Sequence, residues 1–416
     1  MISSTSNSLN RYILDGTERC VACGLCLPWC PTYQLEHREF ESPRGRLALL
    51  QALARSELRQ TDSTSELLAH CLLCRSCEKH CPSSVPFGEI MDASRRQTLQ
   101  TKPQTPGLSR KLAEFALRRP EWLRRLGYPA SMLRMLLPGG IKNKPIANNT
   151  IPSLRYLPSV QAHSAWRTIY PATGDKRGQV SLFLGCVART LDARTIDDAI
   201  RLLNLQGFDV LIPSQQACCG ALSLHEGRYE VALELMRANR SAFGGEHIES
   251  VVHMSTGCGA SLNEYTLHIG DDGGLSEKVS EICAFVDQQW INRPFATATD
   301  RHIMLHCPCS LRNGSMDPEA PVRLLAHAPG IRVTQLDSGY GCCGAAGTHM
   351  LSRPEAAVTL RSPLIDQIMA EKPDAVATTN PGCALHLSEG LRAAGLEIPV
   401  LHPVSVLIDQ LLKSEE

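Results

Sequence analysis

Two cysteine-rich runs decide the fold of the N-terminal region: Cys20-Val-Ala-Cys23-Gly-Leu-Cys26-Leu-Pro-Trp-Cys30-Pro31 and Cys71-Leu-Leu-Cys74-Arg-Ser-Cys77-Glu-Lys-His-Cys81-Pro82. Both follow the spacing C-x₂-C-x₂-C-x₃-C-P. Three thiolates at this spacing can wrap one face of a cubane 4Fe–4S cluster, while the fourth cysteine, beside a proline, reaches a second cluster. Two such runs in tandem therefore predict two 4Fe–4S clusters and a chain that transfers single electrons.

The expected ligand sets cross between the two runs. One cluster is predicted to bind Cys20, Cys23, Cys26 and Cys81, and the other Cys71, Cys74, Cys77 and Cys30. Structural zinc is the alternative, because it also uses paired C-x₂-C motifs. A zinc ion needs four ligands, whereas each run supplies four cysteines with a trailing proline, so the pattern favours iron–sulfur clusters.

Composition limits the class of protein. The 416 residues carry 42 Lys and Arg against 42 Asp and Glu, so the chain has no basic footprint for nucleic acid. Its N-terminal residues lack the apolar core of a secretory signal, and no apolar run is long enough to span a bilayer. The 18 cysteines are therefore expected to act as metal ligands in a reducing compartment, the cytoplasm.

Residues 1–100 are predicted to form a helical ferredoxin-like domain that holds both clusters. The segment between the two runs contains Ser42-Pro43-Arg-Gly-Arg46, a helix start, followed by apolar residues at helical spacing.

A basic connecting region is expected over residues 101–177. Within it, 108–138 is amphipathic and could lie on an anionic membrane, which would give peripheral contact with the inner face of the cytoplasmic membrane. Pro120 and Gly127 interrupt a long interfacial helix, so we favour two helices packed on the protein or on a partner. Residues 139–177 are rich in Pro, Asn and Ser and predict an extended connector.

The remaining chain is an internal repeat, over 178–295 and 296–416. Three pairs of segments correspond: Val180–Cys186 with Ile303–Cys309, Ala217–Ala221 with Gly341–Ala345, and Ser255–Gly259 with Asn380–Ala384. Short β-branched runs alternate with helical stretches in both copies, which predicts two Rossmann-like α/β domains with parallel sheets. The fold class is thus α+β and multidomain. Because the cysteines follow the strand runs, they are expected at the carboxyl ends of the strands.

Each repeat offers a cysteine, a Cys-Cys-Gly triplet and a further cysteine as metal ligands. The first set is Cys186, Cys218, Cys219 and Cys258, and the second is Cys342, Cys343 and Cys383 with Cys309 or Cys307. The two repeats are offset by a nearly constant number of residues, as the two Cys-Cys pairs show. The offset from Cys186 to Cys309 is closer to this number than the offset from Cys186 to Cys307, which favours Cys309. Adjacent cysteines suit different irons of one cluster and are poor disulfide partners. Zinc is again the alternative, because four soft thiolates fit either metal.

Other candidate residues carry less chemistry. Cys283 lies in an apolar run and is expected to be a core thiol. His80, His306 and His386 lie near cysteines, where they could donate hydrogen bonds to sulfur. No residue is predicted to be catalytic.

Taken together, these motifs resemble the iron–sulfur subunits of bacterial glycolate oxidases over nearly the whole chain. The resemblance rests on the tandem cysteine runs, on Cys30-Pro-Thr-Tyr33, on Ser42-Pro-Arg-Gly-Arg46 and on the two Cys-Cys-Gly repeats. His306-Cys-Pro-Cys309 and Gly341-Cys-Cys-Gly344-Ala-Ala-Gly347-Thr strengthen it. The wider superfamily includes heterodisulfide reductase subunits and the iron–sulfur subunit of anaerobic glycerol-3-phosphate dehydrogenase.

This resemblance implies an electron-transfer subunit of a flavin-dependent 2-hydroxy acid (glycolate) dehydrogenase or oxidase. Such a subunit takes electrons from two flavoprotein partners and passes them toward a quinone or another acceptor. Hydroxy acid oxidation needs a flavin, and this sequence has no G-x-G-x-x-G between a strand and a helix. The flavin is therefore expected on the partner subunits, and the isolated chain is not expected to be catalytic.

Two alternatives come from the same superfamily. The first is a catalytic subunit like that of heterodisulfide reductase, in which the Cys-Cys-Gly repeat ends in C-x-x-C. Here Cys258 is followed by Gly-Ala-Ser261 and Cys383 by Ala-Leu-His386, so both repeats lack the final cysteine and disulfide reduction is disfavoured. The second is the anaerobic glycerol-3-phosphate dehydrogenase subunit. A zinc-structured scaffold, from a different class, is disfavoured by the two N-terminal cysteine runs.

Overall fold

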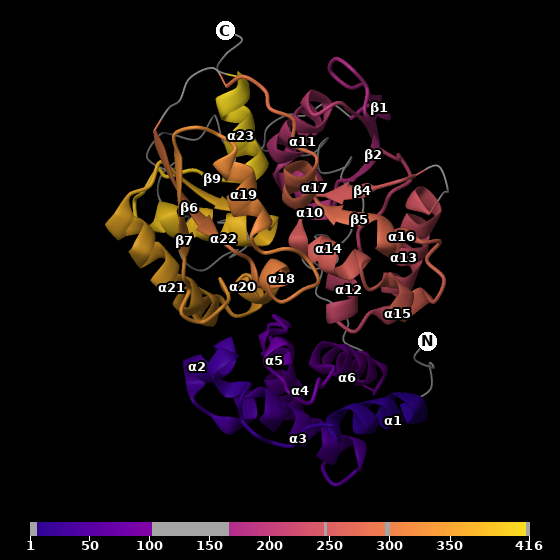
Figure 1. Cartoon of the computed structure of the whole chain (residues 1–416). Helices are drawn as coiled ribbons and strands as arrows, with labels where there is room; N and C mark the ends of the chain where they lie inside the picture. The colour runs from indigo at the N-terminus through magenta and orange to yellow at the C-terminus, as the bar shows by residue number, and fades with distance from the viewer. Residues whose placement is uncertain (1–5, 102–165, 245–247, 296–299, 413–416) are drawn as a thin grey trace, which may run out of the picture.

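The computed structural model describes residues 6–101, 166–244, 248–295 and 300–412. A helical module lies at one end of two α/β repeats (Figure 1). The amphipathic segment predicted at 108–138 lies outside the described residues, as does most of the predicted connector. In the part of the chain that is described, no helix is both long and apolar enough to cross a membrane.

The N-terminal module is built from helices and tight turns, as the sequence predicts. Its elements are α1 (Ser6–Thr17), η1 (Leu27–Trp29), α2 (Pro31–Glu36), η2 (Glu39–Glu41), α3 (Pro43–Ala54), α4 (Asp62–Ala69), α5 (Ser76–Lys79) and α6 (Phe87–Thr101). Ser42 caps α3 by accepting the Gly45 amide hydrogen, and Pro43 occupies the first turn. Apolar side chains of α1, α3 and α6, such as Leu9, Leu50 and Ile90, form the module's core.

Each repeat contains a parallel sheet of the same topology. The first sheet comprises β1 (Ile169–Tyr170), β2 (Gly178–Phe183), β3 (Phe208–Leu211), β4 (Val251–His253) and β5 (Val279–Glu281), in the order β1-β3-β2-β4-β5. The second comprises β6 (Arg301–His306), β7 (Ile331–Leu336), β8 (Ala375–Thr378) and β9 (Val400–Leu401), in the order β7-β6-β8-β9. Only β1, at an edge, pairs antiparallel among the described strands. The order β3-β2-β4-β5 thus corresponds to β7-β6-β8-β9, which confirms the predicted repeat, while β1 has no counterpart among the described strands of the second sheet.

Helices cover both faces of the sheets. The first repeat has α10 (Cys186–Leu191), α11 (Ala193–Leu205), α12 (Ala221–His225), α13 (Tyr229–Phe243), α14 (Thr256–Leu262), α15 (Tyr265–Ile269), α16 (Leu275–Lys278) and α17 (Ile282–Gln288). The second has α18 (Cys309–Arg312), α19 (Ala320–Ala326), α20 (His349–Ser352), α21 (Pro354–Glu371), α22 (Pro381–Ala393) and α23 (Pro403–Leu412). Helix α11 packs on α23, and α17 packs on α19 (Figure 1). These four helices form a central layer between the two sheets.

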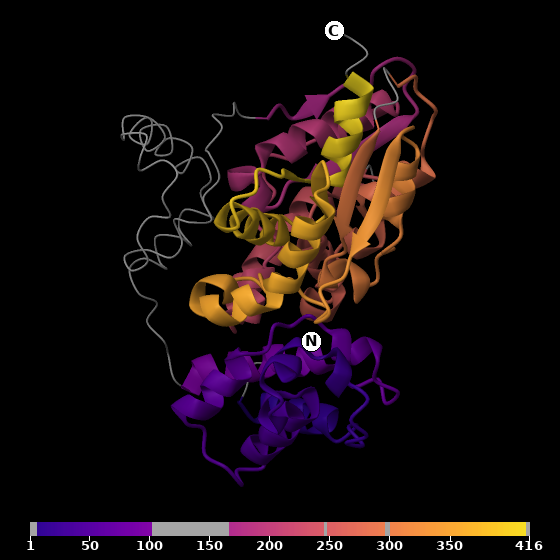
Figure 2. The same ribbon diagram turned by 90° about the vertical axis from the view of Figure 1, so that its left-hand side faces the viewer.

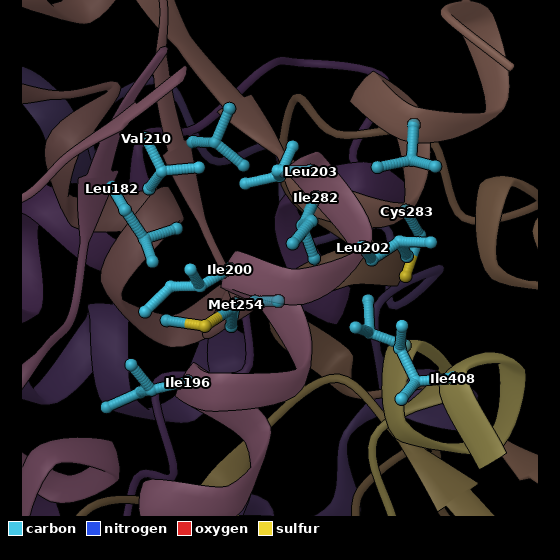
Figure 3. Close-up of a cluster of buried hydrophobic side chains, with 14 of the residues drawn as sticks. Leu182, Ile196, Ile200, Leu202, Leu203, Val210, Met254, Ile282, Cys283 and Ile408 are labelled. Carbon is cyan, nitrogen blue, oxygen red and sulfur yellow. The ribbon is translucent and has the colours of Figure 1, made fainter. Parts of the chain in front are cut away.

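This central layer gives the repeats a common core. Leu182 and Ile200 of the first repeat share one buried cluster with Leu324 and Ile408 of the second, and Figure 3 shows part of it. Burial of apolar surface is the main favourable term in folding. Each repeat therefore covers the inner apolar face of the other.

The module lies against one end of the two repeats (Figure 2), and its helix α6 contacts α12 of the first repeat. The Arg96 guanidinium lies 3.8 Å from the centre of the Tyr229 ring, and Arg95 Nη1 donates to the His225 carbonyl at 2.8 Å. Gly227, with φ +78°, lies so close that an added Cβ would collide with the Arg95 carbonyl. A backbone-to-backbone contact thus sets the distance between module and first repeat.

Replacing Gly227 with alanine should loosen this docking. The left-handed backbone alone costs a residue with a Cβ about 1–2 kcal/mol, and the collision should add about 1–3 kcal/mol. Gly174→Ala is the matched control, because Gly174 also has positive φ but an added Cβ there meets nothing within 4 Å. Thermal unfolding and limited proteolysis measure both variants. Equal effects of the two substitutions would contradict the close contact.

Candidate iron–sulfur centres

The cysteines of the first predicted cluster set gather around one hollow. Cys20, Cys23, Cys26 and Cys81 all line it, and so does Cys77 of the other predicted set. Burial, opposed in part by nearby backbone amides, raises the pKa of Cys26 to about 11. The structure thus brings the fourth cysteine of the second run to the first three of the first run.

The two runs share an unusual backbone conformation. In the first run, Ala22 has φ 54° and Gly24 has φ 81°; in the second, the corresponding Leu73 has φ 50° and Arg75 has φ 57°. Left-handed conformations cost a residue with a Cβ about 1–2 kcal/mol each. Strain repeated at equivalent places on both sides of the second cysteine is typical of a ligand-binding loop. The backbone conformation of both runs therefore suits a bound group that three cysteine thiolates surround.

The second predicted set is more deeply buried. Burial raises the pKa values of Cys71, Cys74 and Cys77, and Cys30 lies close enough to contribute a like charge to each of them. The rings of Trp29 and His80 stack at a centroid distance of 3.8 Å and join the two runs. Cys30 is thus directed toward the second run, as the crossed ligand sets require.

A buried ionic network supports this second set. Arg46, of which only 1% is exposed, donates through Nη2 to the Glu41 carboxylate and through Nη1 to Thr32 Oγ1 at 2.9 Å. Glu41 Oε1 contacts His70 Nδ1 at 2.5 Å, and Cys30 Sγ lies 3.4 Å from Thr32 Oγ1. Although burial alone would raise it, His70 and Arg46 together lower the pKa of Glu41. The network connects Cys30 to His70, the residue before Cys71.

In the first repeat, the four predicted cysteines lie at the carboxyl ends of neighbouring strands. Cys186 starts α10 after β2, Cys218 and Cys219 follow β3, and Cys258 lies in α14 after β4. The Cys186 and Cys218 sulfurs are 3.3 Å apart. Their hydrogen bond, and then burial, raises the pKa of Cys186. Cys186 and Cys258 flank the point where the strand order reverses, which is where open α/β sheets bind ligands.

The second repeat has an equivalent site. Cys309 follows β6, Cys342 and Cys343 follow β7, and Cys383 follows β8; the sulfurs of Cys343 and Cys383 are 2.9 Å apart. A hydrogen bond with Cys342, and then burial, raises the pKa of Cys309. Cys307, the alternative candidate, instead contacts the carbonyl of Pro308 at 3.9 Å. The geometry therefore favours Cys309.

His306 belongs to this second site. A nitrogen of its ring and the sulfurs of Cys343 and Cys383 lie within 4.8 Å of one another. Burial lowers the pKa of His306 to about 3, so the ring is neutral and keeps a lone pair. The sequence indicated His306 only as a neighbour of cysteines. Its place at the end of β6, facing the reversal point, is the signal that could have identified it.

The second set of the module adjoins the site of the second repeat. Leu72 packs with Cys309 and Cys342 in one small apolar cluster. Asn313 Nδ2 donates to the Cys74 carbonyl at 2.8 Å. Burial, and then the neighbouring Cys309, raises the pKa of Cys74 well above its usual value. Thiols of the module and of the second repeat are therefore direct neighbours.

All 18 cysteines are free thiols. Neutral thiols packed this densely form few good hydrogen bonds, whereas a bound metal deprotonates its thiols and balances their charge. The four sets thus fit iron–sulfur clusters, although zinc accepts similar ligands.

Comparison with known proteins agrees with this geometry. Residues 16–85 match the 4Fe-4S dicluster domain, and residues 180–263 and 303–388 each match the cysteine-rich domain. The glycolate oxidase iron-sulfur subunit of Escherichia coli is 31% identical over 95% of this chain and 94% of its own length. The chain belongs to the family of glycolate oxidase iron–sulfur subunits.

Two further relatives of this chain can be compared with it. A probable glycolate oxidase iron-sulfur subunit of Bacillus subtilis is 28% identical over 94% of this chain and 93% of its own length. Lactate utilization protein A of Macrococcus caseolyticus is 24% identical over 55% of this chain and 97% of its own length. The family resemblance predicted from the motifs is confirmed.

Removing Arg46 should destabilise the module strongly. Arg46→Met leaves Glu41 buried without its cation, and breaking a buried pair in this way costs about 3–5 kcal/mol. Arg55→Met removes the exposed pair with Glu18 and should change stability by less than about 1 kcal/mol. Urea unfolding and retention of iron on gel filtration measure both. If Arg46→Met keeps wild-type stability and iron, the network does not support the second set.

Proposed function

We propose that this chain is the electron-transfer subunit of a flavin-dependent 2-hydroxy acid dehydrogenase or oxidase complex, with glycolate as the expected substrate. The observation that carries the proposal is the contact between the second thiol set of the module and the site of the second repeat. A reduced flavin holds a pair of electrons. Iron–sulfur clusters, when bound, carry one electron at a time, so they can pass this pair on in single steps.

The proposed ligands in the module are the eight cysteines of the two runs. In the repeats they are Cys186, Cys218, Cys219 and Cys258, and Cys309, Cys342, Cys343 and Cys383, with His306 as an additional donor. The crossed sets within the module and the cluster type in the repeats stay predictions, as do the domain limits at residues 100, 177 and 295.

The first thiol set is placed to meet a partner. Around it, Val21, Leu25 and Trp29 are 69%, 57% and 49% exposed, and Cys23 is itself exposed. Exposed apolar side chains clustered beside a redox site suit a surface that another subunit covers. The set at this surface, the less exposed second set and the site of the second repeat form a sequence of adjoining thiol groups from the surface inward.

The flavin is proposed to lie on partner subunits, and the terminal acceptor is a quinone or another electron carrier. On this account the chain alone does not oxidise a hydroxy acid, because the cysteine sets supply no group that accepts a hydride. We expect the complex in the cytoplasm or on the inner face of the cytoplasmic membrane.

Mixing the purified chain with candidate flavoprotein subunits from the same organism tests this function. Addition of glycolate or lactate should bleach the visible absorption of the iron–sulfur centres and reduce a quinone analogue only in the mixture. Cys26→Ser in the first set should abolish bleaching while the flavin is still reduced. The substitution Cys307→Ser, at a cysteine outside the four proposed sets, is the matched control and should leave bleaching intact. Turnover by the isolated chain would contradict the proposal.

A further inference from the structure

A second type of donor cluster lies between the two repeats, apart from the four cysteine sets. Glu281 ends β5 and precedes α17, while His402 follows β9 and precedes α23. These are equivalent positions in the two sheets, which have the same topology. Because α17 and α23 both belong to the central layer, the pseudo-symmetry of the repeats brings the starts of these helices together. Cys283 joins them from the first turn of α17.

The three side chains form a compact, buried group. A carboxylate oxygen of Glu281, the sulfur of Cys283 and a ring nitrogen of His402 all lie within 4.8 Å of one another. Their exposed fractions are 3%, 0% and 5%. In Figure 3, the Cys283 sulfur lies on the side of the apolar cluster that faces Ile408 of α23. Sequence reasoning treated Cys283 as a core thiol, and it is indeed enclosed by the core, but next to two polar donors.

Helix capping explains only part of this arrangement. Glu281 Oε2 caps α17 by accepting the amide hydrogens of Cys283 at 2.8 Å and Ala284 at 3.2 Å. Oε1, the other oxygen, is buried and has no hydrogen-bond partner. A buried carboxylate oxygen without a partner is costly, so its position calls for a further ligand. That oxygen is the second, independent sign of a binding site.

His402 is prepared to act as a ligand. Burial lowers its pKa to about 3, which keeps the ring neutral. Nδ1 accepts the Val404 amide hydrogen at 3.2 Å, so its lone pair is already used. Nε2 is buried and has no hydrogen-bond partner. In the tautomer that carries the ring proton on Nδ1, Nε2 has the lone pair and can bind an ion, and the hydrogen bond from Val404 is then lost.

Two further carboxylates lie near the group: Asp317 helps to raise the pKa of Glu281, and Asp287 helps to raise that of Cys283. His253, whose Cα pairs with Glu281 across β4 and β5, is fully buried, and burial lowers its pKa to about 4. Neither of its ring nitrogens has a hydrogen-bond partner. Without a cation, burial raises the pKa of Glu281 to about 7 and that of Cys283 well above its usual value. One thiolate and one carboxylate would instead balance a dication, and the site would be neutral.

We propose that Glu281, Cys283 and His402 bind one divalent transition metal ion of the zinc class, which joins the two repeats across their pseudo-symmetry axis. One sulfur, one imidazole nitrogen and one carboxylate oxygen are donors that zinc accepts, with a fourth position left for a water. The Glu281 and Cys283 side chains lose their protons to solvent when the ion binds. Since all three side chains are buried, the role we propose for the ion is structural.

Metal analysis of the full-length, iron-loaded protein tests this site. Wild-type protein should hold about one zinc per chain after gel filtration, with X-ray absorption showing one Zn–S distance of about 2.3 Å and N/O ligands at about 2.0–2.2 Å. Cys283→Ser and His402→Gln should each lose this zinc while their iron content stays that of the wild type. His302→Gln is the matched control, since His302 lies near the start of β6 and hydrogen-bonds to Thr334 instead.

Glu281→Gln keeps the shape of the side chain and the folded state, and it should weaken zinc binding at least tenfold in competition with a chelator. A sulfur-only zinc spectrum would assign the metal to the Cys-Cys-Gly sites and overturn the proposal. It is equally overturned if wild-type protein carries no metal besides iron, or if Cys283→Ser and His402→Gln retain the wild-type zinc content.

Discussion

The structure depends on the crowding of buried thiols at the carboxyl ends of parallel strands. A thiolate cannot be buried beside other thiolates without a cation, and a neutral thiol is a weak hydrogen-bond donor. In the second repeat, Cys343 and Cys383 are 2.9 Å apart and both are buried. Packing of this kind is stable when a metal takes the protons' place. The strands, the reversal point of each sheet and the docked module all serve to hold these thiols in position.

The two repeats share a topology but meet the module differently. The first repeat contacts it through charged and aromatic side chains, including the Arg75–Glu264 ion pair and the Arg96–Tyr229 contact. The second repeat contacts it through thiols and apolar groups around Leu72 and Cys342, and through the hydrogen bond from Asn313 to the Cys74 carbonyl. Duplication therefore produced two equivalent sites, and the thiols of the second repeat adjoin those of the module's second set. We infer that the second repeat has the more direct part in electron transfer.

Much of this arrangement could be predicted from the sequence. The cysteine runs predicted the helical module, and the strand-then-cysteine pattern predicted sites at the carboxyl ends of both sheets. The fold and the placement of the cysteines could be predicted because they follow from residue type and spacing, as in Cys20 to Cys30; metal binding at these sites stays a prediction. The Ser42–Arg46 segment was likewise predicted to start a helix, and Ser42 does cap α3.

Other features could not be predicted, because they arise from packing between distant segments. The sequence of α11 indicates an apolar face that must be buried. It does not indicate that α23 of the other repeat covers this face. In the sequence, Arg46 looks like an exposed helix residue. In the structure, Glu41 and His70 enclose it. Similarly, Glu281 and His402 are far apart in sequence and meet only through the pseudo-symmetry of the two sheets.

We propose that the module's second thiol set and the site of the second repeat are neighbouring redox centres. The most direct measurement is the power saturation of the reduced module's low-temperature EPR signals, since a nearby paramagnetic centre speeds spin relaxation. The account predicts slower relaxation when Cys342 and Cys343 are both changed to serine. It predicts no change when Cys218 and Cys219 are both changed. Identical saturation in both double variants would contradict it, as would a change confined to the Cys218 and Cys219 variant.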